Sequence, residues 1–167
     1  CKQTLAGHAS RIYAACFSPD SKKVLTASGD RTARLFVAAT GSCEKTFESH
    51  GEAVYAASFS PNGDKVLTAC ADGNARLFGV ETGQCEMTYG GHALAVHTAA
   101  FSPDGRRVLT ASDDRIVRLF DADSGHLLRA FEGHGEHVYA ALFSPDGREI
   151  LTASEDRTAK LFAVELL

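Results

Sequence analysis

The sequence predicts an all-β fold built from repeats, and three observations support this prediction. A segment of similar sequence occurs four times, and each copy alternates short apolar runs with turns rich in Gly, Pro and Asp, which is typical of short strands joined by hairpins. No part of the repeat requires a helix. We therefore expect one domain, residues 1–167, with repeats at 8–49, 50–91, 92–133 and 134–167. The repeats begin at histidines spaced 42 residues apart, which are His8, His50, His92 and His134.

Each repeat contains four predicted strands. The first runs are IYAACF, VYAASF, VHTAAF and VYAALF, whose small central residues suit a strand crowded near a central axis. A Ser-Pro-Asp-Gly turn follows, in which Pro fixes the first turn dihedral and Gly accepts positive φ. Ser21 replaces this glycine in the first copy, which costs roughly 0.5–1 kcal/mol if the residue is left-handed. Runs such as KVLTAS, TARLF and CEKTFE provide the other three strands.

Composition and charge exclude several classes of protein. The chain is 44% hydrophobic and 23% charged, with a net charge of -4 and no basic block, so we expect neither nucleic acid nor a membrane as a partner. No apolar run has the length of a membrane span, and the first residues lack the apolar core of a signal peptide. Because the sequence starts at Cys1 and not at Met, we expect a fragment, a processed form or an engineered segment. We also expect an intracellular, cytoplasmic location.

The cysteines and histidines do not form a metal or disulfide pattern. Cys1, Cys43 and Cys85 occupy one repeat position, which is Leu127 in the last copy, and no C-x-x-C pair is present. We expect reduced thiols that pack as small apolar residues, and they favour a reducing compartment. The best metal candidate is the segment 134–137, His-Gly-Glu-His, but its second histidine has no counterpart in the other copies. We therefore predict no metal and no cofactor.

Motifs for catalysis are also lacking. The sequence contains no glycine-rich phosphate loop, H-E-x-x-H motif, nucleophile elbow or calcium loop. We therefore predict that the protein is not an enzyme.

A Gly-His pair, the Ser-Pro-Asp-Gly hairpin, an Asp turn and an aromatic residue recur over essentially the whole chain. This combination resembles the WD-repeat β-propeller family. The resemblance implies blades of four antiparallel strands, four blades per chain, with each sequence repeat offset by one outer strand. Phenylalanine replaces the family's tryptophan in every copy, and because it lacks the indole N–H, we expect a weaker hydrogen-bonded network. These phenylalanines are Phe36, Phe78, Phe120 and Phe162.

The resemblance also implies a structural network in each blade. A histidine, a threonine and an aspartate would join the loop before the inner strand to the turn after the second strand. The implied sets are His8, Thr26 and Asp30; His50, Thr68 and Asp72; His92, Thr110 and Asp114; and His134, Thr152 and Asp156.

The offset of the repeats predicts how the blades assemble. The last repeat stops after its third strand, whereas residues 1–7, CKQTLAG, align with the outer strand CEKTFES. An unpaired strand edge and an orphan outer strand both seek partners. Residues 1–7 would complete the last blade of their own chain, giving a four-bladed ring, or the last blade of a partner chain. We expect a homodimer that forms one eight-bladed ring, because eight blades need a turn of only about 45° per blade.

Function is expected where the repeats differ, on loops held by a rigid frame. The loops directly after the repeat histidines diverge, and the resemblance implies that they surround the top opening, where a protein or peptide would dock. Drift at exposed positions is an equal alternative. The sequence does not decide whether Tyr13, Tyr55 and Tyr139 line the channel or pack in the core. The candidate rim residues are Arg11, Glu52, Leu94, Glu136 and His137.

We therefore expect a noncatalytic protein-interaction scaffold that assembles through its repeat ends. The alternative is a purely structural, self-assembling or engineered propeller fragment without a dedicated ligand, which the close similarity of the first two copies favours. A small-ligand or sugar-binding propeller would need a recurring aromatic and polar pocket in each repeat, and the differing loops argue against it.

Overall fold

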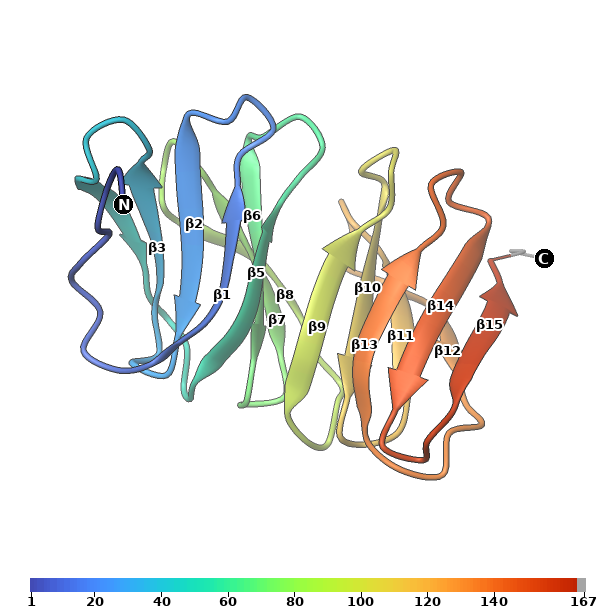
Figure 1. Ribbon diagram of the computed structural model, residues 1–167. Helices are drawn as coiled ribbons and strands as arrows, with labels where there is room; N and C mark the ends of the chain where they lie inside the picture. Colours follow the sequence, from blue (N-terminus) through green and yellow to red (C-terminus); the bar gives the residue numbers. More distant parts are fainter. Residues whose placement is uncertain (165–167) are drawn as a thin grey trace.

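The computed structural model describes residues 1–164, which form four antiparallel sheets and contain no helix. Residues 165–167, the end of the fourth predicted repeat, lie outside the described residues. Figure 1 shows the sheets side by side in chain order. The all-β prediction is confirmed. Residues 1–164 accordingly contain no helix that could cross a membrane.

Within each sheet the strands follow one another in chain order, as in a meander. The first three sheets have four strands and the last has three. The first sheet contains β1 (Ile12–Phe17), β2 (Lys23–Ser28), β3 (Ala33–Val37) and β4 (Cys43–Phe47). The second contains β5 (Val54–Phe59), β6 (Lys65–Cys70), β7 (Ala75–Gly79) and β8 (Cys85–Tyr89). The third contains β9 (Val96–Phe101), β10 (Arg107–Ser112), β11 (Val117–Asp121) and β12 (Leu127–Phe131), and the fourth contains β13 (Val138–Phe143), β14 (Glu149–Ser154) and β15 (Ala159–Ala163).

The first hairpin of each sheet closes with the turn chemistry expected from its sequence. Between β1 and β2, the Ser18 hydroxyl donates to Asp20 Oδ1 at 2.6 Å and the Ser21 N–H donates to Ser18 O at 2.8 Å. Ser21 has a φ of 60°, so it is left-handed, as are the glycines at the same place in the other sheets. The turn therefore depends on backbone geometry that glycine would adopt with less strain.

The hydrophobic core lies between successive sheets. Leu25 and Leu35 of the first sheet are fully buried in one cluster with Val54 and Val66 of the second. The strands β1, β5, β9 and β13 lie next to one another, so the first strand of every sheet faces a common centre. This arrangement is that of propeller blades.

The two outermost sheets each leave one apolar face uncovered. Leu151 and Leu161, which correspond to buried leucines of the other sheets, are 49% and 61% exposed. On the first sheet, Ile12 is 47% exposed, whereas Val54 at the same position of the second sheet is fully buried. The N-terminal and C-terminal sheets lie at opposite sides of the row in Figure 1. Among the described residues, β15 has no fourth strand beside it, and residues 1–7 form no strand, so they do not complete the last sheet of their own chain.

Candidate interaction surface

A hydrogen-bonded network joins the loop before the first strand of a sheet to the turn after its second strand. In the first sheet, His8 Nδ1 lies 2.8 Å from Asp30 Oδ2 and His8 Nε2 lies 2.7 Å from Thr26 Oγ1. The histidine thus joins the carboxylate through Nδ1 and the threonine hydroxyl through Nε2. The same contacts occur between His92, Asp114 and Thr110, and between His134, Asp156 and Thr152.

The second sheet departs from the set that the resemblance implies. His50 Nδ1 lies 3.1 Å from Arg31 O, while its Nε2 lies 2.9 Å from Thr68 Oγ1. The carboxylate of Asp72 instead lies 2.8 Å from Arg76 Nη2. The implied contact between His50 and Asp72 is therefore wrong, because a backbone carbonyl takes the place of the carboxylate beside the histidine. An arginine on the carboxylate does not by itself cause this difference, since Arg118 lies 2.8 Å from Asp114 in the third sheet and His92 keeps its contact with Asp114.

Burial and hydrogen bonding fix the charges of this network. Burial opposes ionisation of Asp30, but hydrogen bonds from Thr32, the Ala9 N–H and His8 outweigh it and hold the pKa of this carboxyl well below its usual range. Burial, together with the positive charge of Arg76, lowers the pKa of His50 to about 4. At neutral pH Asp30 is therefore a carboxylate and His50 a neutral imidazole, which suits a structural role.

The predicted rim residues lie on the loops that lead into β1, β5, β9 and β13. Leu94 is 51% exposed, and Arg11, Glu52 and Glu136 are also exposed, whereas His137 is half-buried. Glu136 Oε2 lies 3.8 Å from Arg115 Nη2 of the preceding sheet, and both side chains are more than half exposed. The rim therefore presents side chains of different chemistry on a rigid frame.

An aromatic row, which the sequence left unplaced, runs across the four first strands. The rings of Tyr13 and Tyr55 have centroids 5.1 Å apart, Tyr55 and His97 stack at 4.9 Å, and His97 and Tyr139 meet edge to face at 5.2 Å. Each of these residues is the one skipped by a bulge between the first two strands of its sheet. A bulge redirects a side chain out of the regular alternation. The row consequently lies at the surface, with both end tyrosines exposed.

Two carboxylates beside this row were missed in the sequence. Asp113 Oδ1 lies 2.7 Å from His97 Nε2 and 3.1 Å from His137 Nδ1. Glu155 Oε2 lies 3.2 Å from Tyr139 Oη and 3.6 Å from His137 Nδ1. The sequence contained a signal for these two carboxylates, because their repeat position holds Gly29 and Ala71 in the first two copies and an acidic residue only in the last two. Within residues 1–164, no three His, Cys, Asp or Glu side chains are placed to hold a metal ion.

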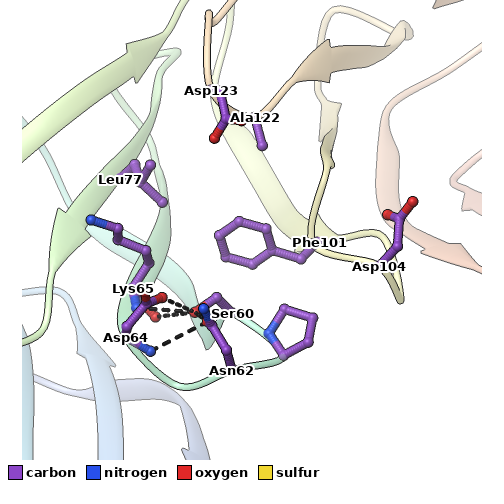
Figure 2. A pocket seen from close by; sticks show the side chains of 11 residues that line it. Ser60, Asn62, Asp64, Lys65, Leu77, Phe101, Asp104, Ala122 and Asp123 are labelled. Atoms are coloured by element: carbon purple, nitrogen blue, oxygen red, sulfur yellow. Dashed lines mark hydrogen bonds between the residues drawn. The ribbon is translucent and has the colours of Figure 1, made fainter.

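Cavities also occur between the sheets, on the side of the Ser-Pro turns. Figure 2 shows one of about 250 Å³, into which Leu77 of the second sheet and Phe101 of the third sheet project. Its polar lining is engaged in the turn itself, since the Ser60 hydroxyl donates to Asn62 Oδ1 at 2.7 Å. A second cavity of about 310 Å³ is lined by matching repeat positions between the first two sheets. We interpret both as gaps inherent in the repeat and not as ligand sites.

An open apolar hollow lies where β1, β5, β9 and β13 end, at the opposite end of these strands from the rim loops. Its volume is about 520 Å³, and its lining repeats one phenylalanine and one proline from each sheet. The phenylalanines are Phe17, Phe59, Phe101 and Phe143. Because polar groups that could orient a ligand are few here, the rim and the aromatic row carry more of the recognition chemistry.

Comparisons with known proteins agree with this geometry. The family described as "WD domain, G-beta repeat" matches residues 1–36, 41–78, 83–121 and 125–162. A segment of 36 residues is 50% identical to the Notchless protein homolog of Arabidopsis thaliana. That segment is 22% of this chain and 8% of the relative, so the match spans a small part of both proteins.

Proposed function

Because the chain belongs to the WD-repeat family of β-propellers, we propose that it is a noncatalytic protein-interaction scaffold that completes its ring with a second copy of itself. The divergent, exposed rim on a frame of fixed hydrogen bonds carries the scaffold part of this proposal. WD-repeat propellers serve generally as platforms for protein binding, which supports the same role here. The five free thiols agree with a reducing, intracellular location, which is part of the proposal.

The partner of the rim would be a protein or peptide with both apolar and charged contacts. Leu94 offers an exposed apolar side chain, and Glu52 offers a carboxylate on the neighbouring loop. Protein interfaces combine an apolar core with a polar, solvent-accessible rim, and the two side chains offer one contact of each kind. The rim therefore favours a protein partner over a sugar or a small metabolite.

The assembly part rests on the position of residues 1–7. Gln3 Nε2 donates to Ala39 O of the first sheet at 2.9 Å, and Lys45 Nζ of β4 makes the matching contact with Glu81 O of the second. Cys1 Sγ lies 3.0 Å from Gln3 O, as Cys43 Sγ lies 3.6 Å from the backbone two residues on within β4. Residues 1–7 thus contact the first sheet as an outer strand does, while no third strand is beside them. These contacts support pairing with β15 of a second copy.

The solution mass tests the assembly. Light scattering after size exclusion, over a range of concentrations, should give a mass near twice 17.7 kDa. Removal of residues 1–7 should shift the equilibrium to the monomer, because β15 then loses its fourth strand. The variant Lys22→Ala, in an exposed turn, is the matched control and should leave the mass unchanged. An unmodified chain of residues 1–167 that stays monomeric at every concentration would refute assembly through the repeat ends.

Affinity capture tests the scaffold. The chain and the variants Glu52→Ala and Leu94→Ala would be used as baits, with Lys22→Ala as a control away from the rim. A rim partner should be retained by the control and lost at least about tenfold by the rim variants, since interface anchors contribute on the order of 1–2 kcal/mol each. Equal capture by every bait, or no specific capture, would favour the alternative of a purely structural module.

A further inference from the structure

We propose that an ion pair between Arg11 of one copy and Glu155 of a second copy determines how the two copies recognise each other. This inference rests on the proposed assembly of two chains into one ring, and it identifies the contact that selects the partner. It comes from comparing equivalent positions at successive junctions between sheets.

The junction between the third and fourth sheets provides the pattern. There the carboxylate of Asp113 is held by His97 of its own sheet, at 2.7 Å, and by His137 of the next sheet, at 3.1 Å. Three repeat positions therefore meet: one on the bulge of the first strand, one after the second strand, and one on the loop of the following sheet. The carboxylate is 20% exposed because the following sheet covers it.

The fourth sheet carries the same arrangement with its last member missing. Glu155 occupies the position of Asp113 one repeat later, and its Oε2 accepts the Tyr139 hydroxyl at 3.2 Å, as Asp113 contacts His97. Its side chain is 52% exposed, since no following sheet covers it. The residue one repeat beyond His137 is, in a ring of two copies, Arg11 of the second copy.

The chemistry of Arg11 fits this place. Its side chain is exposed, and its guanidinium carbon lies 5.9 Å from the centre of the Tyr13 ring. A guanidinium can donate two parallel hydrogen bonds to one carboxylate, and it stacks well on aromatic rings. The junction would continue the aromatic row as well, because Tyr139 of one copy would meet Tyr13 of the other.

The other junctions show why this pair would be selective. At the first two junctions the matching positions hold only small residues, Gly29 with Ala53 and Ala71 with Ala95. The apolar faces around Leu161 and Ile12 provide buried area, but apolar area alone does not discriminate among similar sheets. A buried like-charge contact costs several kcal/mol, so the sign of the charge at these two positions decides which surfaces can join.

Charge reversal tests the pair. The variants Arg11→Glu and Glu155→Arg should each dimerise at least about 100-fold more weakly than the unmodified chain, because both junctions of the ring then hold like charges. An equimolar mixture of the two variants should restore the dimer, since each junction again joins an arginine to a glutamate. The double variant Arg11→Glu/Glu155→Arg should restore it as a homodimer.

Controls separate this effect from net charge and from misfolding. Lys22→Glu and Glu132→Arg make the same charge changes at exposed positions away from the junction, and both should dimerise normally. Circular dichroism should show the same β content for every variant. If the unmodified chain dimerises and the single reversals dimerise equally well, or if the mixture fails to recover, the ion pair is refuted while the ring survives. An unmodified chain that stays monomeric refutes both.

Discussion

At the scale of single residues, equivalent arginines have different partners in the first two repeats. Thr32 Oγ1 donates to Asp30 Oδ1 at 2.7 Å, and in that sheet Arg34 Nε is buried with no hydrogen-bond partner among the described residues. In the second sheet, asparagine replaces the threonine, and Arg76 contacts both carboxylate oxygens of Asp72, at 3.1 and 2.8 Å. The same arginine is therefore an ion-pair partner in one repeat and an unsatisfied donor in another.

Substitution of the two arginines should separate these roles. Arg76→Met should lower the free energy of unfolding by about 2 kcal/mol, because it leaves the partly buried carboxylate of Asp72 without its counter-charge. Arg34→Met should change it by less than about 1 kcal/mol, since the unsatisfied donor is removed and the apolar stem is kept. Urea unfolding of both variants measures the difference. Equal losses would contradict this account of the two arginines.

The lowered pKa of His50 predicts a dependence of stability on pH. The pKa is about 4 in the folded chain, against about 6.5 when unfolded, so between these values the unfolded chain binds the extra proton and stability falls as the pH falls. From pH 7 to pH 5 this loss amounts to about 2 kcal/mol. The lowered pKa of Asp30 acts only below the usual carboxyl range and does not contribute in this window.

Comparison with His50→Gln isolates this group. Glutamine does not titrate, so the variant should lose about 2 kcal/mol less than the unmodified chain between pH 7 and pH 5 in urea unfolding. The same pH slope in both proteins would show that His50 is not the source.

Contacts between residues could be predicted from the sequence only where the repeat pattern holds. The sets around His8, His92 and His134 follow from the repeat, and His92 keeps its contact with Asp114 although Arg118 also pairs with that carboxylate. The contact of His50 with Arg31 O could not be predicted, because a backbone carbonyl of the first sheet takes the place of the aspartate. Competition between a backbone carbonyl and a side chain for one histidine is not encoded in a spacing pattern.

At the scale of elements, the first hairpin turn forms although one of its positions holds a residue that the turn geometry does not favour. Ser21 takes a φ of 60° where the corresponding residues are Gly63, Gly105 and Gly147. A left-handed serine is strained, and the turn around it still forms because the Ser18 and Asp20 hydrogen bonds are kept. The geometry of the element therefore outweighs the preference of one residue.

Ser21→Gly should stabilise the chain by about 0.5–1 kcal/mol, because glycine adopts the left-handed conformation without strain. Ser42→Gly is the matched control, since Ser42 is not left-handed, and it should be neutral or destabilising. Thermal unfolding of both variants is the measurement. A gain in the control as large as that of Ser21→Gly would point to a nonspecific effect.

The strands and hairpins were predictable because their signals are local, whereas the bulges were not. A Pro-Asp-Gly turn fixes its own dihedrals, but the bulge at Tyr13 arises from the pairing of β1 with β2. For that reason the sequence could not decide between channel and core for the tyrosines. The bulges answer that question, and they also bring His97 into the same row.

At the scale of the whole molecule, the first and the fourth sheet each leave an apolar face uncovered. Leu151 and Leu161 on one side and Ile12 on the other occupy positions that are buried in the intermediate sheets. The sequence anticipated both edges through the offset of its repeats. It could not specify the ion pair proposed at the junction, since that required knowing which side chains of neighbouring sheets meet.

If two copies share one ring, the melting temperature should rise with protein concentration. Association stabilises the folded chain by mass action, by about 1.4 kcal/mol for each tenfold excess over the dissociation constant. Scanning calorimetry over a hundredfold range of concentration would measure the shift, with the variant lacking residues 1–7 as the control. A melting temperature independent of concentration would indicate that the uncovered faces stay uncovered.

The aromatic row has an optical consequence. The chain has four tyrosines and no tryptophan, so its intrinsic emission comes from tyrosine alone, and three of these rings belong to the row. Tyr13 and Tyr139 stand at its two open ends, and a junction between copies would bring them as close as Tyr13 and Tyr55 are within one chain, where the centroids are 5.1 Å apart. Excitation would then pass between the two tyrosines that meet at each junction, and the polarisation of the emitted light would fall as the ring closes. If two copies share one ring, tyrosine emission would thus report its formation without a label.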